Sequence, residues 1–159
     1  MKITCIAVGK VKEKFYQQAI AEFQKRLGKY TKLEIIEVPD EKTPDKAGEK
    51  LEKQIKDTEG GRILKHIREK DYVIALAIEG TAMDSLQFSA KIENLGLKGT
   101  GNVVFVIGGS LGLSEDVLKR SDETLSFSRM TFPHQLMRVI LLEQIYRCFR
   151  IIHGEPYHK

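Results

Sequence analysis

The sequence predicts an α/β fold built on a parallel sheet. Apolar runs alternate with amphipathic helical stretches from one end of the chain to the other, as in proteins whose strands and helices alternate. Three of the apolar runs are continuous, at Ile3–Val8, Tyr72–Ile78 and Val103–Ile107. Continuous runs indicate strands that are covered on both faces. No repeat or linker interrupts the 159 residues, so we expect a single domain over residues 1–159.

The first two elements are a strand and a helix. Ile3–Val8 ends at Gly9, which is typical of a short buried strand. From Lys12 onward, apolar residues recur at spacings of three and four, which predicts an amphipathic helix that stops near Gly28. These apolar residues are Tyr16, Ile20, Phe23, Leu27 and Tyr30.

A second strand and a charged helix follow. Leu33–Val38 predicts the strand, which Pro39-Asp40 ends. The helical stretch continues to about Glu69 and contains Gly60-Gly61. Because each glycine costs about 1 kcal/mol in a helix interior, we expect a bend or a break at this pair.

The second half of the chain continues the alternation. Ser85–Leu95 predicts a helix between two of the continuous strands, and Ser114–Arg120 a short helix with its serine as N-cap. Thr124–Ser128 alternates weakly and is expected to be a fifth strand. Pro133 can then open a long helix that runs to about Ile152.

The last helix has almost no polar face. Most of its positions from Leu136 to Ile152 are apolar, and helices that are apolar all round are buried. In a domain of this size we expect part of this surface to meet a second subunit, with Ile145 and Phe149 in the interface. The sequence therefore predicts a homodimer.

The charge is unevenly distributed along the chain. The net charge is +4, with +6 in residues 1–32 and +3 in residues 119–159, while the middle of the chain is acidic. Two interpretations stay open: a basic surface that meets a polyanion where the two ends converge, or ordinary solvated helix faces.

Several classes of protein are excluded by composition. Cys5 and Cys148 form no CxxC pair, and the four histidines show no metal-ligand spacing, so we expect no metal and no disulfide framework. The first apolar run ends at Val8, too short for a signal peptide, and the longest uncharged stretch has 16 residues. We expect a cytoplasmic protein with no membrane span.

Three segments follow the carboxyl ends of expected strands, where open α/β sheets bind their ligands. They are Glu79–Thr81, Gly108–Leu113 and Phe127–Phe132. The glycine-rich second segment is neither GxGxxG nor a Walker A loop and lacks a phosphate-pairing lysine. It suits a flat, nucleoside-like ligand better than a di- or triphosphate, although its glycines could also be simple turn residues.

Potential donors gather near the carboxyl terminus. The arginines of this region are Arg129, Arg138, Arg147 and Arg150, and Tyr157 and His158 follow in a short tail. Arg147 lies four residues after Glu143, so an ordinary helix ion pair explains it as well as a function does. Tails of this kind are often frayed.

Five segments together resemble one known family: ITCIAVGKVKEKF, EVPDEK, VFVIGGSLGL, LSFSRMTFPHQLMRVILLEQIYR and the ending GEPYHK. The chain is similar over its full length to the RlmH (YbeA-type) proteins, which are minimal members of the SPOUT class of S-adenosylmethionine-dependent RNA methyltransferases. The resemblance implies a parallel α/β sheet with a carboxyl-terminal trefoil knot, assembled as a homodimer. The implied reaction is methylation of ring nitrogen 3 of a pseudouridine in 23S ribosomal RNA. Because the net charge is only +4, we expect docking on the assembled ribosome rather than tight binding to any RNA.

The resemblance also implies roles for individual residues. By matching position, the cofactor pocket would be formed by Leu76, Gly108, Phe127, Ser128, Arg129, Met130, Thr131 and Phe132. Arg147, Tyr157 and His158 match positions tied to substrate handling and catalysis. One departure is Ser110-Leu111, where relatives can carry Pro-Glu; Leu111 allows backbone contacts but has no polar side-chain group to offer.

The chemistry gives the tail a task. His158 can take the imide proton or support developing carbonyl charge, and Tyr157 can stack on an extruded base. We expect a mobile tail that becomes ordered with substrate and reaches across the dimer. Two alternatives remain: a SPOUT ribose methyltransferase acting on transfer RNA, and a non-catalytic RNA- or ribosome-binding module.

Overall fold

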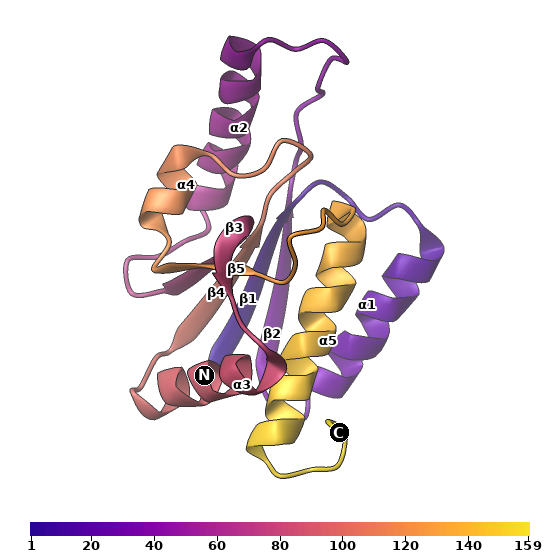
Figure 1. Ribbon diagram of the computed structural model, residues 1–159, viewed down its shortest axis with the longest axis vertical. Coiled ribbons are helices and arrows are strands. Elements are labelled where there is room, and N and C mark those ends of the chain that lie inside the picture. The colour runs from indigo at the N-terminus through magenta and orange to yellow at the C-terminus, as the bar shows by residue number, and fades with distance from the viewer.

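Five parallel strands form one sheet in the order β2-β1-β4-β3-β5 in the computed structural model, which describes residues 1–159 (Figure 1). The expected α/β class is confirmed. The strands are β1 (Lys2–Val8), β2 (Lys32–Val38), β3 (Tyr72–Ala82), β4 (Asn102–Ile107) and β5 (Glu123–Ser126). The helices are α1 (Lys14–Leu27), α2 (Glu49–Leu64), α3 (Ser85–Leu97), α4 (Glu115–Arg120) and α5 (His134–Ile152).

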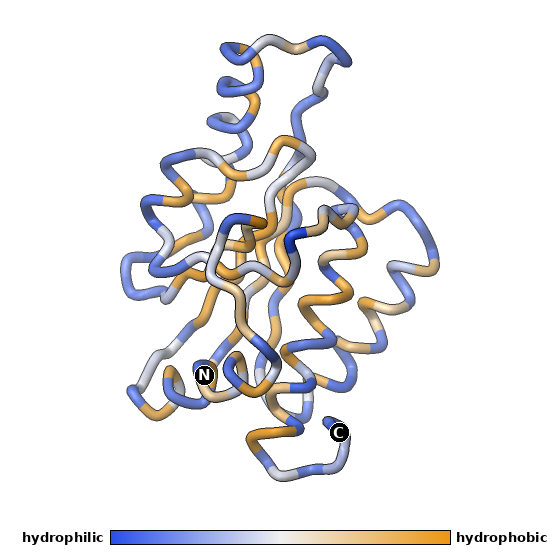
Figure 2. Tube along the Cα trace, in the orientation of Figure 1, coloured by the Kyte–Doolittle hydropathy of each residue, from blue (hydrophilic) through white to orange (hydrophobic).

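Helices cover both faces of the sheet. Along β4, Val103, Phe105 and Ile107 pack with α1, α3 and α5, whereas Val104 and Val106 pack with α2 and α4. This alternation explains why the central strands read as continuous apolar runs. In Figure 1, α2 and α4 lie on one side of the strands and α1 and α5 on the other, and in Figure 2 the strands between them are mostly hydrophobic.

The helices α3 and α4 are each capped at their first turn by side chains that are close in the sequence. Asp84 and Gln87 form a reciprocal capping box at α3. The Ser114 hydroxyl accepts a hydrogen bond from the Val117 N–H at 3.3 Å, so the expected N-cap of α4 is confirmed. These caps satisfy amide groups that the first turn of a helix leaves unpaired.

The expected break at Gly60-Gly61 is wrong, because α2 runs through both residues. Gly60 is buried against α4, where a Cβ atom would overlap the Ser114 hydroxyl. The absent side chain allows α2 and α4 to approach closely. The packing gained there offsets the low helix propensity of glycine.

The expected Glu79–Thr81 loop is also wrong, because β3 extends to Ala82. Its register against β5 shifts between Leu76 and Thr81, and both residues pair with Leu125. A Cβ atom on Gly80 would lie 2.8 Å from the Leu125 amide nitrogen. Glycine therefore allows the backbone of β3 to lie directly against that of β5.

The expected burial of α5 is confirmed, but the choice of interface residues is not. Ile145 and Phe149 are 0 % and 8 % exposed, and both belong to the core that α5 forms with the sheet. They are therefore core residues of the single chain. The partly exposed apolar side chains of α5 include Leu136, Val139, Ile140 and Ile151.

The two glycines of α2 provide a matched test of close approach. Gly60→Ala should lower the free energy of unfolding by about 1–3 kcal/mol, because its methyl group meets Ser114. Gly61→Ala should raise it by up to about 1 kcal/mol, because no atom lies within 4 Å and alanine favours the helix. Urea unfolding measures both; equal effects of the two substitutions would contradict the packing of α2 on α4.

Candidate functional site

The glycine-rich loop after β4 is a tight turn at the carboxyl edge of the sheet. The Gly112 N–H donates to the Gly109 carbonyl at 3.1 Å, and Gly112 has a φ of +91°. A Cβ atom on Gly108 would lie 2.8 Å from the carbonyl carbon of Gly112. Gly108 is therefore required by the closure of the loop itself, whether or not a ligand is bound.

The Phe127–Phe132 loop, which follows β5, carries unpaired backbone donors. The Ser128 hydroxyl accepts a hydrogen bond from the Met130 N–H at 2.9 Å. The other backbone N–H groups of this loop have no partner in the chain, nor do those of Ser110 and Leu111. Such groups at the end of a sheet can bind a ligand that carries hydrogen-bond acceptors.

Apolar side chains lie between and beside these loops. In the sheet β3 is placed between β4 and β5, so the two loops flank Leu76, the last residue of β3 before its register shift. The Phe127 ring packs edge to face on Phe88 with centroids 6.3 Å apart. Leu76 and Phe127 are half-buried against the same core, whereas Arg129 and Met130 are exposed.

The three residues assigned to catalysis by resemblance lie together at the other end of α5. The Arg147 guanidinium donates to Nδ1 of His158 at 3.2 Å and lies 4.6 Å from the centroid of the Tyr157 ring. Arg147 also pairs with Glu143, and the Tyr157 hydroxyl donates to Oε2 of Glu143 at 2.9 Å. Glu143 thus contacts both Arg147 and Tyr157. The ordinary helix ion pair that the sequence offered for Arg147 is present, and it belongs to this cluster of side chains.

Protonation states follow from these contacts. Because a guanidinium only donates hydrogen bonds, Nδ1 of His158 is the acceptor and the neutral ring carries its proton on Nε2. Burial and the hydrogen bond to Glu143 raise the pKa of Tyr157. The phenol therefore stays protonated near neutral pH and acts as a donor.

The tail is folded back on the chain by polar contacts, and its ordering with substrate stays a prediction. Glu155 pairs with Arg150 and accepts a hydrogen bond from the Tyr30 hydroxyl at 2.8 Å. Arg150 also donates to the Pro156 carbonyl at 2.9 Å. These contacts hold Tyr157 and His158 against α5.

The two groups of candidate residues are far apart in one chain. The Phe127–Phe132 loop leads into the start of α5, and Arg147 lies thirteen positions after His134 along this helix. At 1.5 Å per residue this corresponds to about 20 Å. The structure therefore forms each group but does not bring the two together within one chain.

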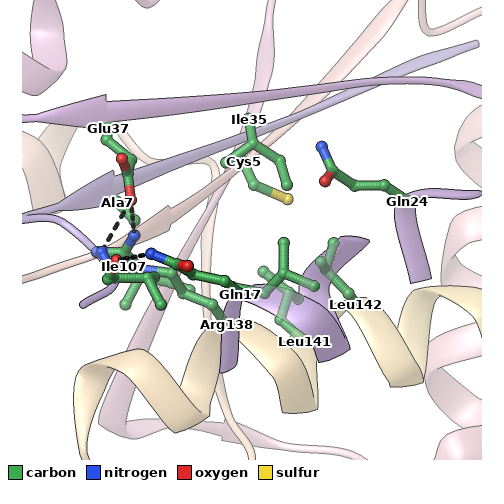
Figure 3. A pocket seen from close by; sticks show the side chains of 12 residues that line it. Cys5, Ala7, Gln17, Gln24, Ile35, Glu37, Ile107, Arg138, Leu141 and Leu142 are labelled. Carbon is green, nitrogen blue, oxygen red and sulfur yellow. Dashed lines mark hydrogen bonds and ion pairs between the residues drawn. The ribbon is translucent and has the colours of Figure 1, made fainter. Parts of the chain in front are cut away.

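Arg138 is a buried anchor rather than a free donor. It pairs with Glu37 at 2.6 Å and donates to the carbonyls of Val8 and Gly9. It also lines a hollow of 320 Å³ between the sheet and the helices α1 and α5 (Figure 3). None of the residues assigned to the cofactor or to catalysis lines this hollow.

Glu59 is a residue that sequence reasoning missed. It is 4 % exposed, its Oε2 accepts a hydrogen bond from the Glu41 N–H at 2.9 Å, and its Oε1 has no partner. A Cβ atom on Gly109 would lie 3.1 Å from Oε1, so the carboxyl group lies close to the glycine-rich loop and leaves little room for a side chain at Gly109. The only sequence signal is its spacing: Glu59 lies four residues after Ile55 and four before Ile63, on the apolar side of α2.

Comparison with known proteins identifies the family of the chain. The family model described as "Predicted SPOUT methyltransferase" matches residues 1–158. The chain belongs to the SPOUT methyltransferase family. This confirms the resemblance found in the sequence.

Similar SPOUT proteins carry names that state a substrate class. Full-length relatives named "Ribosomal RNA large subunit methyltransferase H" are 65 % identical in Bifidobacterium adolescentis and 62 % identical in a Clostridium botulinum strain. One from Clostridium perfringens, "Ribosomal RNA large subunit methyltransferase H 1", is 60 % identical. Each alignment covers all of both chains.

Two further properties concern metals and membranes. No cluster of three or more histidine, cysteine or acidic side chains is placed to hold a metal ion. None of the helices has the length and apolar character needed to cross a membrane.

Glu59 gives this SPOUT protein a testable pH dependence. Burial raises the pKa of Glu59 above its usual value, so the ionised form is less stable in the folded than in the unfolded chain. At acidic pH Glu59 is protonated and does not destabilise the fold. Its destabilising effect appears as the pH rises through the raised pKa. Glu59→Gln should therefore gain stability relative to the parent between pH 4 and pH 8. Thermal unfolding at both pH values measures this, and a constant difference would contradict it.

Proposed function

We propose that the protein transfers a methyl group from S-adenosylmethionine to ring nitrogen 3 of a pseudouridine in 23S ribosomal RNA, within the large subunit or the whole ribosome. The observation that carries this proposal is full-length identity of 60–65 % to relatives named as methyltransferases of large-subunit ribosomal RNA. Residues 1–159 would act as a single SPOUT domain.

The two loops at the carboxyl edge fit the methyl donor. The unpaired N–H groups of the Phe127–Phe132 loop and of Ser110 and Leu111 match the carboxylate and the ring nitrogens of S-adenosylmethionine. Leu76, Gly108 and the loop residues Phe127, Ser128, Arg129, Met130, Thr131 and Phe132 would hold it. When bound, it supplies an electrophilic methyl group on a sulfonium.

The carboxyl-terminal group would prepare the base. Loss of the imide proton spreads negative charge onto the two flanking carbonyl oxygens. In our proposal Arg147 turns from His158 to one of these oxygens, which frees Nδ1 of His158 to accept the proton. Tyr157, held by Glu143, would contact the extruded base.

The site would be shared between two subunits. The separation of about 20 Å along α5 keeps the folded-back tail of one chain away from its own loops. A second copy packed on the partly exposed face of α5 would supply the missing half. We further propose that the carboxyl-terminal third is threaded as a trefoil knot, because the chain belongs to the SPOUT family.

Replacement of His158 tests the function. His158→Ala should lower methyl transfer to ribosomes by about 10²–10⁴, because a general base or charge stabiliser is lost, while affinity for S-adenosylmethionine is retained. Lys159→Ala is the matched control and should transfer at the parental rate. Mass spectrometry of nucleosides identifies the product: a methylated ribose in transfer RNA, or no cofactor binding in calorimetry, would overturn the proposal.

Mixed dimers test the shared site. Gly108→Val should disable the loop of one chain, since its side chain collides with Gly112. His158→Ala disables the tail of the other. If the site is shared, co-expression of the two variants should restore activity that neither has alone, since one site of a mixed dimer has an intact loop and an intact tail. No recovery in verified mixed dimers would show that each site uses the tail of its own chain.

A further inference from the structure

The segment Lys10–Phe15 joins the carboxyl end of β1 to α1 at the same edge of the sheet as the two loops (Figure 1). The Lys12 N–H donates to Oε1 of Gln135 at 3.2 Å. Gln135 lies in the first turn of α5, three residues after Phe132. The segment is therefore fixed beside the Phe127–Phe132 loop.

The segment concentrates free positive charge. Lys10, Lys12 and Lys14 are exposed, and none of them forms an ion pair. The single acidic residue among them, Glu13, is also unpaired. By contrast, Lys53 on α2 pairs with Asp57 at 2.7 Å and lies among other carboxylates.

An exposed aromatic ring accompanies this charge. The Phe15 side chain is 61 % exposed, and its ring lies 4.3 Å from that of Tyr16. It packs outside both apolar cores. Alternating lysines beside an exposed ring are the combination that binds single-stranded nucleic acid, since the cations contact phosphates and the ring stacks on a base.

We propose that Lys10, Lys12, Lys14 and Phe15 form a docking surface for a single-stranded segment of RNA next to the target base. The proposal rests on the proposed function for its substrate class. The lysines contact successive phosphates, Phe15 stacks on a base that flanks the target, and Gln135 fixes this surface relative to the methyl-donor loops. The net charge of +4 is small, so a local surface explains RNA binding better than the whole molecule does.

The matched test exchanges three lysines in two places. One variant carries Lys10→Gln, Lys12→Gln and Lys14→Gln; the control carries Lys50→Gln, Lys53→Gln and Lys56→Gln on α2, with the same change in net charge. The probes are a short fluorescein-labelled oligouridine and purified ribosomes. The first variant should raise the Kd for the oligonucleotide and the KM for ribosomes at least about tenfold at low salt. It should reduce the salt slope of binding by about two, because each phosphate contact on a single strand contributes roughly 0.7.

Phe15→Leu separates stacking from charge. It should weaken oligonucleotide binding about five- to a hundredfold without changing the salt slope, because the ring and not a cation is lost. Equal effects of the two lysine triples, or an unchanged slope in the first, would overturn the proposal. Weaker binding to ribosomes with unchanged binding to the oligonucleotide would indicate a protein contact and would also overturn it. If the parent protein binds the oligonucleotide through this surface but transfers no methyl group, the proposed function fails and the docking surface stands.

Discussion

The arrangement of the carboxyl edge depends on Arg138. Its guanidinium ties the first turns of α5 to the carbonyls of Val8 and Gly9 at the end of β1 and to Glu37 on β2. The Arg138 side chain is only 5 % exposed, so these hydrogen bonds and the ion pair offset the cost of removing its charge from water. This anchor fixes where α5 begins, and therefore where the Phe127–Phe132 loop and the Lys10–Phe15 segment lie relative to each other.

Close backbone approach is the second constraint on this edge. Gly80 allows β3 to lie against β5, Gly108 allows the loop after β4 to close, and Gly60 brings α2 onto α4. At each position a Cβ atom would meet backbone or a buried hydroxyl group. These glycines are therefore required mainly by the packing of the protein and not by contact with a ligand. The donors left for a ligand are the unpaired N–H groups beside them, so the loops are shaped by internal packing before any ligand arrives.

Periodicity predicted nearly every helix and strand, since apolar spacing depends on local geometry. It failed where segments distant in the sequence pack together. Gly60 predicted a break because its packing against α4 cannot be read from local spacing. Likewise, β3 extends to Ala82 because β5 pairs with it. The members of the carboxyl-terminal group were identified by resemblance, but the hydrogen bond from Tyr157 to Glu143 spans fourteen residues and no spacing rule reveals it. The anchoring of the tail by Glu155 and Tyr30 was likewise invisible, because those residues are far apart in the sequence.

One rigid helix sets the distance between the two halves of the proposed site. Because α5 begins at the carboxyl edge and runs antiparallel to the strands, its first turn lies beside the loops and its last turns carry Arg147 and the tail (Figure 1). No change of side-chain rotamer closes about 20 Å. A two-fold axis perpendicular to α5, near its middle, places the start of one helix beside the end of the other. The partly exposed face of α5 carries Leu136, Val139, Ile140 and Ile151, with Glu143 and Arg147 between them. Under the proposal of a shared site, a second copy in antiparallel orientation would both cover the partly exposed face of α5 and supply the other half of the site.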